Sequence, residues 1–295
     1  MLVAGALGFV AHAALSERGR PSTPAAPKEP APGLLTAPAA SETPPAVSSA
    51  RPSASSKARV VCEPTDCVCL RSEATFRLEA DALGSAHVLA SLEQAPPSCA
   101  EALRGPRVEA LARVSRCAEV RSAAEALRET SQGHAEYALA LCAYRGQRPA
   151  EARELAELAV ARGRQAPGHL LLGILALEAR DLAAAEASLR LAGARAPHLA
   201  EAQYNLGLVM QERGRYNDAR TAYLAALAAE PRYHDARYQL VLLTARGGAL
   251  LEARHHLERL RTVLGAQDER VRSGERLVQE RAASNQQALT MPGSR

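Results

Sequence analysis

The chain has 295 residues, a net charge of +4, an aromatic content of 3% and no tryptophan. Lysine occurs only at positions 28 and 57, so arginine carries nearly all of the positive charge. Residues 1–60 contain six basic and three acidic side chains, which leaves the remainder nearly neutral. Because a nucleic-acid-binding protein shows a concentrated basic face, this balance argues against that class.

Residues 1–15, MLVAGALGFVAHAAL, are apolar except for His12. This run is shorter than the roughly 20 residues of a membrane-spanning helix. We expect a membrane anchor whose start lies upstream, or a signal peptide cleaved near Ala11 to Ala13, rather than a buried helix. Residues 16–59 hold nine of the 18 prolines and no aromatic residue, which predicts a disordered, semi-extended linker.

Residues 60–131 are predicted to form degenerate helical hairpins, because apolar residues recur at helical spacing over 107–127. All six cysteines precede the clearest repeats: Cys62, Cys67, Cys69, Cys99, Cys117 and Cys142. Their even number after an export-like segment favours disulfides in an oxidising compartment. We expect one bridge within 62–69 and others between adjacent helices, such as Cys99 to Cys117. The alternatives are a zinc site, whose usual spacing is not matched, and reduced cysteines in helical packing.

Residues 200–231 contain a pattern that recurs at a period of 34 residues, with a leucine-glycine pair, a central alanine and a terminal proline. It resembles the tetratricopeptide repeat (TPR) family, which implies an all-α solenoid of helical hairpins over 132–267. The resemblance assigns packing roles to Gly173, Ala185, Pro197, Gly207, Tyr216, Ala219, Tyr223, Pro231 and Ala253. The glycines and alanines would let paired helices approach closely, the tyrosines would fill the space between repeats, and the prolines would end the second helices.

The flanking repeats match this pattern less well. In 133–165, Gly146 lies one residue too far from Ala152, which predicts an insertion in the turn near Pro149. Charged residues are concentrated in 267–283, so residues 268–295 are predicted to form a capping helix followed by a flexible tail.

The resemblance also implies a concave groove lined by the first helix of each repeat. The corresponding residues are Leu170, Ile174, Leu177, Tyr204, Asn205, Leu208, Gln211, Tyr238 and Leu242. An exposed apolar stripe of this kind would bind a partner's peptide or amphipathic helix. The alternative is that these side chains pack against each other or against the C-terminal helix.

We find no candidate active site, metal site or cofactor motif, so we predict a non-enzymatic protein with no small-molecule substrate. Arg18 and Arg20 favour a cytoplasmic body, but the cysteines favour the periplasm. The leading hypothesis is a protein–protein interaction scaffold of the bacterial cell envelope, held at the inner membrane with its repeats in the periplasm. The alternatives are the sensor part of a membrane-bound kinase or anti-sigma factor, and a cysteine-based metal or redox protein.

Overall fold

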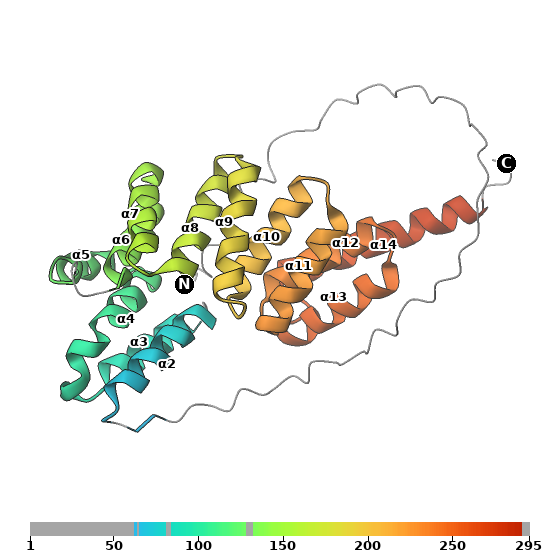
Figure 1. Ribbon diagram of the computed structural model, residues 1–295. Helices are drawn as coiled ribbons and strands as arrows, with labels where there is room; N and C mark the ends of the chain where they lie inside the picture. The colour runs from blue at the N-terminus through green and yellow to red at the C-terminus, as the bar shows by residue number, and fades with distance from the viewer. Residues whose placement is uncertain (1–61, 64, 81–83, 128–131, 291–295) are drawn as a thin grey trace, which may run out of the picture.

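The computed structural model describes residues 62–63, 65–80, 84–127 and 132–290, and this part of the chain is helical throughout (Figure 1). The segments predicted as an anchor and a linker, 1–15 and 16–59, lie outside the described residues. No described helix has both the length and the hydropathy that a bilayer crossing requires. The helices, with a 3₁₀ turn at Pro97–Cys99, are α2 Cys67–Ala80, α3 Ser85–Glu93, α4 Ala100–Arg113, α5 Cys117–Glu125, α6 His134–Arg145, α7 Pro149–Ala161, α8 Gln165–Glu178, α9 Leu182–Arg195, α10 Ala200–Glu212, α11 Tyr216–Ala229, α12 His234–Arg246, α13 Leu250–Leu264 and α14 Glu269–Thr290.

Four helical hairpins, α6–α7, α8–α9, α10–α11 and α12–α13, stack in chain order to form the middle of the body (Figure 1). Glycine allows the paired helices to approach closely in two of the hairpins. A Cβ atom at Gly173 would lie 2.6 Å from Leu189 Cγ, and one at Gly207 would lie 2.4 Å from Tyr223 Cε1. Both distances are far shorter than a carbon–carbon contact. The predicted all-α solenoid of stacked hairpins is confirmed.

The turns between paired helices share one backbone conformation, whatever their sequence. Each contains one residue in the left-handed region, and these residues are Ser115, Gln147, Arg180, Gly214 and Gly248. The next residue in each turn donates its backbone N–H to the carbonyl five residues earlier, as Arg215 does to Met210 at 2.8 Å. This is the bond of a Schellman helix end. The α7–α8 connection has the same bond, from Arg164 N–H to the Ala159 carbonyl at 2.8 Å, so it is a general helix end in this chain.

These turns correct the predicted insertion near Pro149. The residue equivalent to Gly214 is Gln147, with φ of 56°, rather than Gly146. The α6–α7 turn therefore has the same length as the other turns. The repeat is one residue short because three residues, 162–164, join α7 to α8, whereas four residues, 196–199, join α9 to α10.

One predicted packing residue is misplaced. Tyr216, expected to fill the space between repeats, is 59% exposed, because it is the first residue of α11 and points away from the stack. Tyr223, two turns later, is fully buried. The three alanines at the central repeat position are also fully buried: Ala185, Ala219 and Ala253.

The N-terminal helices are tied together by three disulfides, Cys62–Cys69, Cys67–Cys99 and Cys117–Cys142. The first is local to the start of α2, the second joins α2 to the 3₁₀ turn before α4, and the third joins α5 to α6. The expected pairing of Cys99 with Cys117 is wrong, because these residues lie at opposite ends of α4, a helix of 14 residues.

The last helix, α14, packs across α12 and α13, and its C-terminal half extends past α13 (Figure 1). Val271 and Val278 are buried against these helices. A Cβ atom at Gly274 would lie 2.9 Å from Leu257 Cδ1, so α14 approaches α13 closely at this point. The N-terminal half of α14 therefore covers the open end of the solenoid, as a capping helix does.

Candidate binding surfaces and cavities

Most of the side chains predicted to line an apolar groove are buried. The buried ones are Leu170, Ile174, Leu177, Tyr204, Asn205, Leu208 and Leu242. The other two, Gln211 and Tyr238, are half-buried. The chain therefore does not present these residues as an exposed apolar stripe, and that expectation is wrong.

Neighbouring helices and side chains cover the predicted groove. The ring of Tyr204 lies 5.2 Å from that of Tyr233 and 5.9 Å from that of Tyr223, measured between centroids. The Tyr238 hydroxyl donates to Ser273 Oγ of α14 at 3.2 Å. These contacts match the alternative in which the groove residues pack against each other and against the C-terminal helix.

A row of charged residues remains exposed at the C-terminal ends of the first helices. We call Glu178, Glu212 and Arg246 the polar row; they end α8, α10 and α12 and recur at the repeat spacing. Contacts between repeats fix two of them. The Tyr144 hydroxyl of α6 donates to Glu178, and Arg180 forms an ion pair with Glu212 at 2.7 Å. The row is therefore an ordered polar edge that a partner can reach.

Near its N-terminal end, α10 buries a carboxylate that has no hydrogen-bond donor among the described residues. Glu201 is 2% exposed, and neither of its carboxylate oxygens has a partner. One turn later, Asn205 Oδ1 also lacks a partner, while its Nδ2 donates to the Glu201 carbonyl at 2.8 Å. Burial raises the pKa of the Glu201 carboxyl, and the charges of Arg113 and Arg145 oppose that rise only in part.

A buried ion-pair network joins the N-terminal helices to the repeats. Glu109 of α4, which is 0% exposed, accepts two bonds of 2.9 Å from Arg164 at the start of α8. His134 Nδ1 lies 2.9 Å from the same carboxylate, and Arg113 contacts it at 3.3 Å. Arg164 also contacts Glu79 of α2. One carboxylate and one guanidinium group thus hold four separate segments together: α2, α4 and the starts of α6 and α8.

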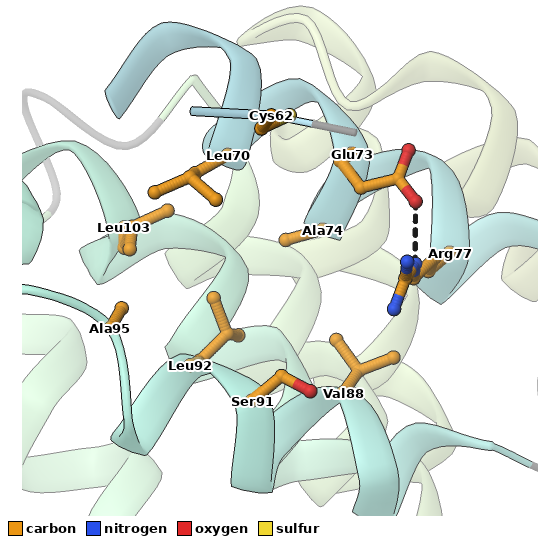
Figure 2. A pocket seen from close by; sticks show the side chains of 10 residues that line it. All are labelled: Cys62, Leu70, Glu73, Ala74, Arg77, Val88, Ser91, Leu92, Ala95 and Leu103. Atoms are coloured by element: carbon orange, nitrogen blue, oxygen red, sulfur yellow. Dashed lines mark hydrogen bonds and ion pairs between the residues drawn. The ribbon is translucent and has the colours of Figure 1, made fainter. Parts of the chain in front are cut away.

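An apolar cavity of about 420 Å³ lies among α2, α3 and α4 (Figure 2). Figure 2 shows Leu70, Leu92 and Leu103 around it, with the Glu73–Arg77 ion pair on one side. The full lining is Cys62, Leu70, Glu73, Ala74, Arg77, Val88, Ser91, Leu92, Ala95 and Leu103. The two charged residues of this lining are paired with each other, so the lining presents an apolar surface and no unpaired charged group.

A second cavity, of about 610 Å³, is polar and lies between α2 and the starts of α6 and α8. Its lining comprises Arg71, Ser72, Thr75, Phe76, Glu79, Gln132, His134, Arg162, Gly163 and Arg164. We call it the polar cavity. None of these residues was singled out by the sequence, because they come from three distant segments and form no motif.

Metal or thiol chemistry finds no support in the described part of the chain. No cluster of three or more histidine, cysteine or acidic side chains could hold a metal ion there. All six cysteines are in disulfides, so the thiolates that the zinc alternative needs are absent.

Comparisons with known proteins identify the repeat. Residues 200–233 match the family model described as tetratricopeptide repeat, so the predicted resemblance is confirmed over that stretch. No curated protein matches the chain. Two solved structures are similar to this chain, each at 16% sequence identity. The first is YrrB, described as a TPR protein with an unusual peptide-binding site; the match covers 70% of this chain and 97% of YrrB, with a TM-score of 0.44. The second is MamA AMB-1; the match covers 66% of this chain and 96% of MamA, with a TM-score of 0.38. At these TM-scores neither structure indicates a function for this chain.

Proposed function

We propose that this protein is a non-enzymatic scaffold of a bacterial cell envelope that binds a partner protein along its stacked hairpins. The observation that carries the proposal is the tetratricopeptide repeat at 200–233 within a continuous stack of similar hairpins. Such stacks present a long surface to a partner, and each repeat contributes the same set of positions to it.

The polar row is the surface best placed to meet the partner. The apolar side chains beneath it are occupied by internal packing, whereas Glu178, Glu212 and Arg246 are exposed on three successive repeats. Glu178 favours a basic residue of the partner opposite α8, and Arg246 favours an acidic residue opposite α12, whereas Glu212 is already paired with Arg180. Exposed charges of this kind contribute more to orientation and association rate than to affinity.

Site-specific photo-cross-linking in native cells tests this surface. A photoreactive residue placed at Glu178, Glu212 or Arg246 should yield one discrete adduct with the same protein. The matched control is Glu258, an exposed acidic residue on α13, and it should yield none. Equal adducts from Glu258, or no adduct from the polar row, would remove the row as the binding surface.

The cell-envelope location is supported by two independent features. All six cysteines are in disulfides, which persist in oxidising compartments. An apolar segment at 1–15 and a proline-rich segment at 16–59 precede the helical body, an order expected for a domain tethered at a membrane. A compartment-sensitive phosphatase fused after Arg295 should be active in cells and should lose activity when residues 1–15 are deleted. An inactive fusion expressed from the native gene would overturn the location.

A further inference from the structure

We propose that the polar cavity is a binding site for a small anion that carries a phosphate or carboxylate group. The cavity lies where α2 crosses the starts of α6 and α8, and its volume of about 610 Å³ falls within the usual range of ligand sites. It is separate from the polar row, which occupies the opposite ends of the first helices. The inference therefore does not depend on the proposed partner surface.

The charges of the lining favour an anion. Three arginines and a histidine face the cavity, against a single carboxylate, Glu79. Both oxygens of Glu79 are already engaged, one by Arg164 and the other by His198 at 3.2 Å. Arg162 is matched by Glu136 at 2.7 Å. Arg71 is the one cation of the lining that no described carboxylate neutralises.

The hydrogen-bonding groups left over in the lining are mainly donors. Arg71, Ser72 and Thr75 lie within one turn and a half of α2, and Gln132 faces them from the start of α6. Their side chains make no hydrogen bond or ion pair to other described residues. A guanidinium group, two hydroxyls and an amide can together surround a phosphate or a carboxylate, whose oxygens only accept.

The backbone adds to this preference. The helices α6 and α8 both begin at the cavity. The residue before each helix, Gly133 or Arg164, makes no side-chain capping hydrogen bond. Helix N-termini carry partial positive charge and favour anions. A bound anion would thus contact α2 on one side and the first two tetratricopeptide-like hairpins on the other.

Isothermal titration calorimetry on the full chain tests the proposal, with inorganic phosphate and succinate as separate titrants and chloride holding the ionic strength constant. We expect saturable binding of at least one titrant, and comparison of the two tells whether a tetrahedral or a planar group is preferred. Arg71→Ala should weaken binding about tenfold or more, and Thr75→Val should weaken it less while leaving the charge intact.

Arg104→Ala is the matched control. It removes the same charge from α4, where Arg104 is exposed and paired with Glu101, and it should leave binding unchanged. Absence of saturable binding in the wild-type chain would overturn the proposal. Equal weakening by Arg104→Ala and Arg71→Ala would also overturn it, because the response would then reflect overall charge. Arg71→Lys keeps the charge and should retain part of the affinity, which separates loss of the site from loss of folding.

Discussion

Arg164 and Glu109, 55 residues apart in the sequence, form a bidentate ion pair in which both nitrogen–oxygen distances are 2.9 Å. Neither residue is exposed by more than 6%. The pair joins the start of α8 to the middle of α4, and through Glu79 it also reaches α2. The N-terminal helices are therefore locked to the repeats by charge as well as by apolar packing.

Breaking this pair should be costly. We expect Arg164→Met to lower the free energy of unfolding by about 3–5 kcal/mol, because it leaves the Glu109 carboxylate buried without its main partner. Urea denaturation at pH 7, followed by circular dichroism, measures the change. The control is Arg148→Met, which removes an exposed ion pair with Glu151 and should cost less than about 1 kcal/mol. Similar losses in both variants would contradict a special role for Arg164.

The same network predicts a pH dependence. Burial favours the neutral form of Glu109, but the charges of Arg164 and Arg113 and the His134 hydrogen bond outweigh it, so the pKa of this carboxyl lies well below its ordinary value of 4.5. A lowered folded-state pKa contributes stability above the unfolded value, and this contribution is lost as pH falls through the folded-state pKa. Glu109→Gln should thus be destabilised at pH 7, and its deficit should shrink as the pH is lowered below about 4.5. A deficit that stays constant down to pH 3 would refute the assignment.

Glu201 should behave in the opposite way. Burial raises the pKa of its carboxyl, and its two oxygens lack donors, so the charged form destabilises the fold as pH rises through the raised value. Glu201→Gln should be more stable than the wild type by about 1–3 kcal/mol at pH 7, and no different near pH 4. Glu258→Gln removes an exposed carboxylate and serves as the control. A less stable Glu201→Gln variant at pH 7 would show that the carboxylate has a partner after all.

The repeat at 200–231 could be predicted from sequence because its spacing follows from packing. There is no room for a Cβ atom at position 207 beside Tyr223, so the close packing of the two helices shows in the sequence as one glycine at a fixed position. The turn positions were harder to predict, since Gln147 and Arg180 adopt a conformation that glycine favours without being glycine. Counting from Gly146 therefore placed an insertion where none exists.

The candidate sites were less predictable for a different reason. The groove positions of the family are open to a partner only when no other side chain covers them. Here Tyr233, at the end of the matched repeat, packs on Tyr204, and Ser273 of α14 bonds to Tyr238. The polar cavity brings together α2 and two later loops. Contacts between segments so far apart in sequence leave no local periodicity.

The close approach at Gly207 gives a direct test of the repeat packing. Alanine there would place its Cβ atom 2.4 Å from the Tyr223 ring, so we expect Gly207→Ala to cost about 1–3 kcal/mol despite the higher helix propensity of alanine. Shortening the obstructing side chain in Gly207→Ala with Tyr223→Leu should give a smaller total loss than the two single changes added together. Urea denaturation of the three variants measures this coupling, and strict additivity would show that the two residues do not meet.

The disulfide Cys117–Cys142 should stabilise the fold more than the local bridge Cys62–Cys69, because it closes a longer loop, with a sequence separation of 25 rather than 7. The chain-entropy relation gives about 3–4 kcal/mol for the longer loop and about 2–3 kcal/mol for the shorter. The longer bridge also holds α5, a helix of nine residues, against α6. Thermal unfolding of the paired variants Cys117→Ala with Cys142→Ala and Cys62→Ala with Cys69→Ala compares the two bridges. Mass spectrometry of unreduced peptides checks the pairing itself, and a peptide that links Cys99 to Cys117 would contradict both the connectivity and the expected order of stabilities.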